Sequence, residues 1–171
     1  KKPAWKRFIV VLAGAAVNIL AGFLAMILLT AIINIGDTTV GKFYPKEDSG
    51  YIISSEDSGL MVGDEIIEVE GKRVVILDEL SYEIMRHGNN PVDLTVIRNG
   101  ERLELYDVVF PREESQGQTF GVRDFLVYAV DKDFSTVMRY SWRKSILIVR
   151  MCWESIIDLI TGRYTIAAVS G

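Results

Sequence analysis

Histidine and cysteine are nearly absent from this chain of 171 residues, which contains one of each, His87 and Cys152. With one thiol the chain forms no internal disulfide, and its cysteine content gives no information about redox compartment. With one imidazole the chain by itself holds neither a His-Glu-x-x-His zinc site nor a zinc cluster of cysteines and histidines. We therefore expect no metal cofactor to be bound by this chain alone.

Charge is distributed unevenly along the sequence. Residues 1–7 carry four positive charges and no negative one, residues 36–134 hold 10 basic and 21 acidic side chains, and residues 135–171 hold 5 basic and 2 acidic ones. A phosphate-binding surface needs clustered Lys and Arg, which the acidic middle lacks. The sequence therefore predicts no nucleic-acid partner.

The longest uncharged run is Phe8–Ile35, with 28 residues of which 16 are Leu, Ile, Phe or Val. As a helix it would reach about 42 Å, more than the roughly 30 Å hydrocarbon core of a bilayer. The apolar part of a signal peptide is shorter, about 7–15 residues. Four basic residues precede the run and Asp37 follows it, so the positive-inside rule predicts a cytoplasmic N-terminus, a membrane-spanning segment within 1–36, and the next domain on the outer face.

Gly14 and Asn18 lie one turn apart on one face of this predicted helix, beside several alanines. Small residues let another helix approach closely, and an amide in hydrocarbon needs a hydrogen-bond partner. Two interpretations stay open. The face is either a helix-packing surface with an interhelical hydrogen bond, or it lines a substrate or catalytic cavity.

Residues 37–111 show the pattern of short strands around one helix, with predicted strands at Thr38–Tyr44, Asp64–Glu70, Val92–Arg98 and Glu101–Phe110. Asn99-Gly100 predicts a two-residue hairpin turn between the last two strands. We expect a small mixed, barrel-like sheet. The polar stretch Pro111–Gln118 predicts an exit loop, which continues into a connector over residues 112–134.

One helix is predicted within this domain, at Leu77–His87. Leu80 and Ile84 fall on one helical face with Leu77, and Gly88 supplies a stop signal. Acidic residues in its first turn are stabilised by the positive N-terminal end of the helix dipole. The helix is expected to cap the sheet.

Ser135–Gly162 is apolar but interrupted by charges that each cost roughly 2.5–3.5 kcal/mol at a bilayer centre. At about 100° per residue, one face collects Met138, Trp142, Val149, Trp153, Ile156 and Ile160, and the other collects Arg139, Arg143, Arg150, Glu154 and Asp158. The pattern predicts an amphipathic helix at the headgroup boundary within 135–171, with a core or inter-domain helix as the alternative. The predicted fold class is α+β.

The segment Ser58–Val74 resembles the bacterial PDZ signature through Gly59, Leu60, Gly63, Asp64, Ile66, Val69, Gly71 and Val74. Ser58 and Glu70 depart from the signature's usual Ala and Asn, and an insertion lies near Lys46–Ile53. In PDZ modules a peptide adds as a strand beside a groove strand and contacts the helix. The resemblance implies a substrate-binding groove lined by Val40, Gly41, Lys42 and Phe43 opposite Leu80 and Ile84, for which plain core packing is the alternative.

The order of these parts resembles the bacterial site-2 protease family of intramembrane zinc metalloproteases. The family's second spanning helix reads W/P-x-x-R-x-x-x-x-x-A-G-P-x-x-N. Arg7, Ala13, Gly14 and Asn18 match it at these intervals, Ala15 replaces Pro, and Trp5 lies one residue closer to Arg7 than the pattern has it. The family's post-PDZ helix ends in L-x-T-G and later S-G, matched by Leu159, Thr161, Gly162, Ser170 and Gly171. The resemblance covers essentially the whole chain.

This resemblance implies a central segment of a multi-pass cell-membrane protease. The family's His-Glu-x-x-His and L-D-G motifs do not occur in the chain, so zinc would be held by helices elsewhere in the complete protein. The implied partners are the lipid bilayer, those zinc-ligand helices and a membrane-spanning protein substrate. Asn18 would orient the substrate backbone, the PDZ-like domain would exclude bulky ectodomains or bind trimmed ends, and the amphipathic helix would gate entry.

One alternative function fits the same features of the sequence, and a second does not. A non-catalytic, membrane-anchored PDZ adaptor or assembly module fits the same anchor and domain. A PDZ-bearing serine protease does not fit, because the chain has no protease domain and His87 alone offers no catalytic triad.

Overall fold

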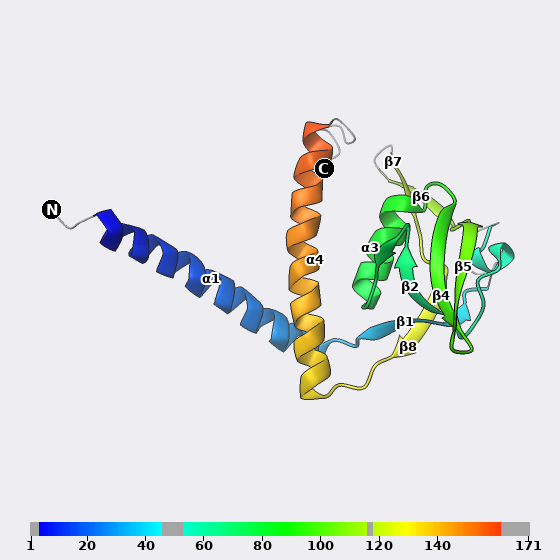
Figure 1. Cartoon of the computed structure of the whole chain (residues 1–171), viewed down its shortest axis with the longest axis horizontal. Helices are drawn as coiled ribbons and strands as arrows, with labels where there is room; N and C mark the ends of the chain where they lie inside the picture. Colours follow the sequence, from blue (N-terminus) through cyan, green and yellow to red (C-terminus); the bar gives the residue numbers. More distant parts are fainter. Residues whose placement is uncertain (1–3, 46–52, 116–117, 162–171) are drawn as a thin grey trace. The chain divides into compact units, whose positions relative to one another are not determined.

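The computed structural model describes residues 4–45, 53–115 and 118–161 (Figure 1). The elements in chain order are α1 (Ala4–Ile32), β1 (Gly36–Phe43), the 3-10 helix η1 (Ser55–Ser58), β2 (Glu65–Val69), β3 (Lys72–Arg73), α3 (Leu77–His87), β4 (Val92–Arg98), β5 (Glu101–Val108), β6 (Arg112–Ser115), β7 (Gln118–Gly121), β8 (Phe125–Ala129) and α4 (Phe134–Ile160). They divide into two compact units, residues 1–34 with 131–149 and residues 35–130 with 150–171. The α+β class is confirmed.

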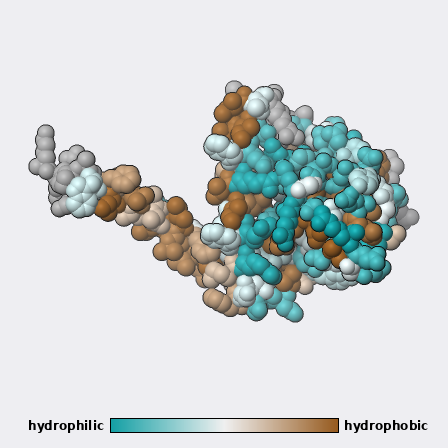
Figure 2. Space-filling model, viewed as in Figure 1, coloured by the Kyte–Doolittle hydropathy of each residue, from teal (hydrophilic) through white to brown (hydrophobic). Residues whose placement is uncertain are grey.

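Helix α1 forms over the uncharged run and exposes nearly all of its large apolar side chains, as the brown stretch in Figure 2 shows. Within the described part of the chain, Phe8–Ile32 is the one helix long and apolar enough to cross a membrane. Lys132 Nζ donates to the carbonyl oxygens of Ala31 and Ile32 at 3.1 and 3.2 Å. These bonds satisfy acceptors that a helix C-terminus leaves unpaired.

Helix α4 begins at a capping aspartate. The carboxylate of Asp133 accepts a hydrogen bond from the backbone N–H of Thr136 at 2.6 Å, which satisfies one of the free donors of the first turn. A helix is present over Phe134–Ile160, where the sequence predicted one within Ser135–Gly162. Its placement at a membrane interface stays a prediction. The Gly162–Gly171 part of the predicted motif lies outside the described residues.

The second unit contains a sheet with strand order β5-β4-β2-β1-β8, and β3 pairs with β2. The four strands predicted between residues 37 and 111 are confirmed within a few residues, and so is the helix Leu77–His87. The expectation of a mixed sheet was wrong, because each pairing among the described strands is antiparallel. Asn99 and Gly100 both have positive φ, 53° and 84°, as the predicted hairpin turn requires.

The predicted exit loop Pro111–Gln118 was also wrong. Strand β6 lies inside it and pairs with β7 in a separate two-stranded sheet, with Glu113 opposite Phe120. All four side chains of β6 are exposed, so it has no apolar alternation by which the sequence could reveal a strand. The predicted connector 112–134 also contains β8, whose Phe125 is opposite Phe43 of β1.

The core lies between the sheet and α3. Its buried residues are Val40, Leu60, Ile66, Val69, Val74, Leu80, Ile84, Val92, Leu94, Val96, Val108, Phe110 and Phe125. Each large apolar side chain removed from water contributes about 1.5–3 kcal/mol. This burial fixes α3 on the sheet and leaves its opposite, charged face available for other contacts.

Strand β7 approaches α3 through glycines. A Cβ atom built on Gly121 would lie 2.3 Å from the carbonyl oxygen of Ile84 and 2.5 Å from Cα of Gly88. Both atoms belong to the backbone, so they cannot move aside as a flexible side chain could. The contact between β7 and the end of α3 therefore requires glycine at position 121.

Replacing Gly121 with Ala should lower the free energy of unfolding by about 1–3 kcal/mol, the usual cost of overpacking. Chemical denaturation followed by circular dichroism measures this change. Thr119→Ala is the matched control, because Thr119 is exposed on the same strand. Equal stability of the two variants would contradict the close approach of β7 to α3.

Candidate functional site

The predicted groove between β1 and α3 is filled. Val40, Leu80 and Ile84 have no exposed surface and belong to one core cluster. Both edges of β1 are occupied at Val40, which exchanges backbone hydrogen bonds with Gly63 and Asp64 on one side and is opposite Val127 of β8 on the other. A peptide strand has no free edge beside Val40, and the burial of Leu80 and Ile84 agrees with the alternative of core packing. A role for Val40, Leu80 and Ile84 in substrate binding stays a prediction.

The remaining residues of the predicted groove lie at the end of β1. Gly41 packs against the backbone of β8, where an added Cβ would lie 3.3 Å from the carbonyl oxygen of Leu126. Lys42 is exposed, and Phe43 contacts Phe125 edge to face with ring centroids 6.0 Å apart. A role for these three residues in substrate binding stays a prediction.

Gly14 and Asn18 lie on the exposed surface of α1. A Cβ added at Gly14 would meet nothing within 4 Å, so this face has room for another helix. Both interpretations of the face, helix packing and a substrate cavity, remain predictions.

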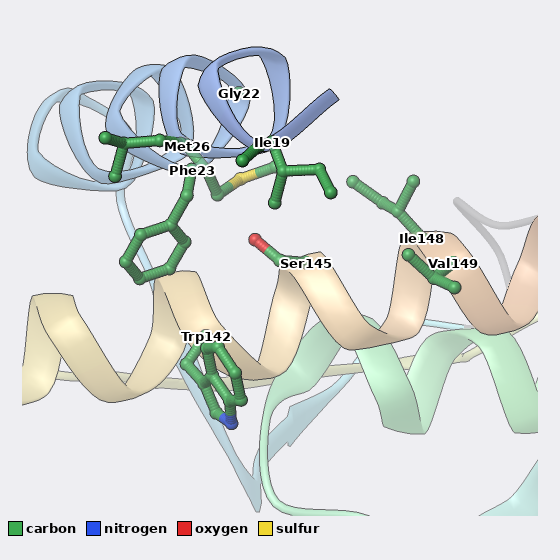
Figure 3. Close-up of a pocket in the computed structure, with 10 residues that line it drawn as sticks. Ile19, Gly22, Phe23, Met26, Trp142, Ser145, Ile148 and Val149 are labelled. Atoms are coloured by element: carbon green, nitrogen blue, oxygen red, sulfur yellow. The ribbon is translucent and has the colours of Figure 1, made fainter. Parts of the chain in front are cut away.

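The first unit contains an apolar pocket between α1 and the beginning of α4 (Figure 3). Its volume is about 620 Å³ and its lining residues are Ala16, Ile19, Leu20, Gly22, Phe23, Met26, Trp142, Ser145, Ile148 and Val149. Phe23 and Trp142 contact each other edge to face at 6.0 Å. The hydroxyl of Ser145 donates to the carbonyl oxygen of Ser141, so the pocket is suited to apolar groups and not to acid–base chemistry.

The aspartate of the PDZ-like signature, Asp64, forms a structural ion pair with Arg98. Asp64 is fully buried, and its two carboxylate oxygens each lie 2.7 Å from a nitrogen of Arg98. The same guanidinium donates to the carbonyl oxygen of Gly59 at 2.8 Å, and Asp64 also accepts from the backbone N–H of Met61. These bonds close the turn that carries the signature and leave no free carboxylate there.

Replacing Arg98 with Ala should destabilise the fold by about 3 kcal/mol, because it leaves the buried carboxylate of Asp64 without its countercharge. Arg102→Ala is the matched control on the neighbouring strand, since Arg102 pairs with Glu68 at an exposed site. That exposed pair should contribute less than about 1 kcal/mol. Urea denaturation of both variants measures the difference, and a similar loss in both would contradict the structural role of Arg98.

A second set of buried charges lies between α3 and residues 150–160 of α4, within the second unit. We call it the α3–α4 cluster, and its members are Tyr82, Glu83, Arg86, Arg150, Glu154 and Asp158. Arg86 binds both carboxylate oxygens of Asp158 at 2.7 and 3.1 Å. Tyr82 donates to Glu154 at 2.6 Å, and Arg150 donates to both Glu83 and Glu154.

The cluster shifts the titration of its members. Burial, together with the hydrogen bond to Glu154, raises the pKa of Tyr82 to about 12. Burial acts to raise the pKa of Glu154, but hydrogen bonds from Tyr82 and Arg150 outweigh it and lower that pKa. At neutral pH Tyr82 is therefore a hydrogen-bond donor and Glu154 a charged acceptor. Burial lowers the pKa of the nearby His87, and the positive charge of Lys72 lowers it further.

The polar face of α4 is turned toward the domain along this segment. Asp158 is 3% exposed, whereas Trp153, Ile156 and Ile160 are 64%, 51% and 79% exposed. The sequence shows which residues share each face of the helix, but it does not show which surface each face contacts. Sequence reasoning missed the cluster for this reason. The signal that could have found it is the one-turn spacing of Arg150, Glu154 and Asp158, which places three charges on one side of the helix.

No group of three or more His, Cys, Asp or Glu residues within residues 4–45, 53–115 and 118–161 is placed to hold a metal ion. Cys152 is exposed on α4. The described residues therefore do not fit a zinc centre of their own.

Comparison with known proteins gives three relatives, each named "Putative zinc metalloprotease", and no family model matches the chain. The protein from Thermotoga maritima is 35% identical over 104 residues, which is 61% of this chain and 19% of the relative. That from Vibrio cholerae is 34% identical over 68 residues, 40% of this chain and 15% of the relative. That from Bartonella henselae is 29% identical over 124 residues, 70% of this chain and 32% of the relative.

The chain is therefore similar to part of each of these proteins, whose printed names describe zinc metalloproteases. The chain spans only 15% to 32% of the length of these relatives.

Proposed function

We propose that this chain is the substrate-handling part of an intramembrane zinc metalloprotease of the site-2 type, which cleaves membrane-spanning proteins. The observation that carries this proposal is an exposed apolar helix long enough to span a bilayer in a chain whose relatives are named as zinc metalloproteases. Zinc and its ligands would come from other parts of the complete protein. This chain would anchor, position and select the substrate.

In this proposal the sheet-containing unit is a PDZ-like domain that restricts access by size. The buried state of Val40, Leu80 and Ile84 favours exclusion of bulky ectodomains over peptide binding between β1 and α3. The turn closed by Asp64 and Arg98 holds the signature segment rigidly, as a steric filter requires. The domain would lie on the outer face of the cell membrane.

Asn18 would hold or orient the backbone of the substrate helix. Its amide lies exposed on α1, and an amide in hydrocarbon forms a hydrogen bond with any available backbone group. Gly14, one turn earlier, leaves room for that helix to approach.

The purified full-length protein should contain zinc and cleave a membrane-spanning substrate, and removing zinc with a chelator should abolish cleavage. Asn18→Ala and Asn18→Leu should each reduce cleavage at least tenfold while zinc content, measured by elemental analysis, stays unchanged. Val17→Ala is the matched control, because its exposed side chain points elsewhere on α1. Cleavage equal to wild type in both Asn18 variants would reduce Asn18 to a packing residue.

A full-length protein that contains no zinc and cleaves nothing would overturn the protease proposal. Tight binding of C-terminal peptides by such a protein would favour the non-catalytic PDZ adaptor instead.

Residues 150–160 of α4 would lie at the membrane interface with the apolar face toward lipid. The exposed side chains of Trp153, Ile156 and Ile160 support this placement. A helix whose outer face meets water would turn these apolar side chains inward and its charges outward.

In vesicles, the fluorescence of Trp153 should therefore be quenched by brominated phosphatidylcholine. The measurement uses a variant with Trp5→Phe and Trp142→Phe, so that Trp153 is the remaining tryptophan of this chain, and tryptophans elsewhere in the full-length protein are likewise replaced. Unbrominated vesicles are the control. Quenching no greater than that by a water-soluble quencher would contradict the interfacial placement.

A further inference from the structure

The charges of the α3–α4 cluster form a complementary pattern on two helices. On α3, acidic Glu83 is followed by basic Arg86, and on α4, basic Arg150 is followed by acidic Glu154 and Asp158. Glu83 faces Arg150, while Arg86 faces Asp158 at 2.7 Å and Glu154 at 3.4 Å. Sliding one helix by a turn would bring like charges together, so the pattern specifies one register.

Glu83 is the most deeply buried charge in this contact. Its side chain is 1% exposed, and its second carboxylate oxygen lies 3.5 Å from both Lys72 Nζ and His87 Nε2. The carboxylate is therefore held by cations on β3 and α4, and the imidazole ring of His87 on α3 lies beside it. Arg150 also places its guanidinium carbon 5.6 Å from the ring centroid of Tyr82, which adds a cation–π contact to the ion pairs.

This contact differs from the packing of α3 on the sheet because its buried groups are charged. The large apolar side chains of the same α4 segment, Trp153, Ile156 and Ile160, are exposed instead. Separating α4 from α3 would return charges to water and would leave the core of the sheet intact. Charged contacts of this kind fix orientation more than they add stability.

We propose that the charged face of α3 is a dock for residues 150–160 of α4, and that Tyr82, Glu83 and Arg86 form a releasable electrostatic latch. The latch holds the apolar face of this α4 segment outward. When it opens, the segment separates from the domain while α3 stays on the sheet. The latch follows from the contacts between the two helices, whereas its use in admitting a membrane-spanning substrate rests on the proposed function.

Distances between spin labels on α3 and α4 test the latch in the full-length protein in detergent. Cys152 is exposed on α4 and Met85 is 37% exposed on α3, so labels at Cys152 and at M85C report the docking, with other cysteines of the protein replaced by Ser. Wild type should give one narrow distance distribution. Arg86→Asp should raise the population at longer distances by about tenfold or more, the effect expected on breaking a buried charge pair.

The charge-swapped variant, Arg86→Asp with Asp158→Arg and Glu154→Gln, should restore the narrow distribution, because Glu154 also faces position 86 and would repel an aspartate there. Arg112→Asp is the matched control, because Arg112 is exposed on β6 and should leave the distances unchanged. If Arg86→Asp prevents folding, as judged by circular dichroism, the milder Arg86→Gln and Asp158→Asn replace it and should raise the long-distance population in the same direction.

An unchanged distribution in the folded single variants, or a charge swap that fails to restore docking, would overturn the latch. The measurement requires neither zinc nor cleavage. A protein that fails the test of proteolysis but shows the charge-dependent distances would therefore retain the latch and lose only the proposed enzymatic role.

Discussion

The helix Leu77–His87 is held from two sides by two different forces. Leu80 and Ile84 enter the core under the sheet, where hydrophobic burial fixes them. Glu83 and Arg86, which the helical rotation turns away from that core, pair with residues of α4. The position of α3 therefore determines both how the sheet is covered and where the second part of α4 lies within the same unit.

Some acidic side chains of the middle region serve internal structure. Asp64 closes the signature turn through Arg98, and Asp124 accepts hydrogen bonds at 2.7 Å from the hydroxyls of Ser54 and Ser55. Glu83 anchors the α3–α4 cluster. A buried carboxylate is stable only when several donors surround it, so these residues fix loops and helices in place.

Two helices, α1 and the second part of α4, leave apolar surface exposed. Helix α1 has no charge between Phe8 and Ile32, and the second part of α4 exposes its apolar face because its charges are paired with α3. Contiguous exposed apolar surface of this extent marks an interaction site, for a membrane or for another protein.

Sequence alone determined the elements whose signals are local. The uncharged run predicted α1, the spacing of Leu80 and Ile84 predicted α3, and Asn99-Gly100 predicted the hairpin turn, because helical periodicity and turn geometry depend on neighbouring residues. Tertiary structure decided the rest. It placed β8 beside β1, filled the expected groove with Val40, and joined Arg86 to Asp158 across 72 positions of sequence. Such contacts depend on the path of the whole chain, since a charged or apolar face does not specify which surface it will meet.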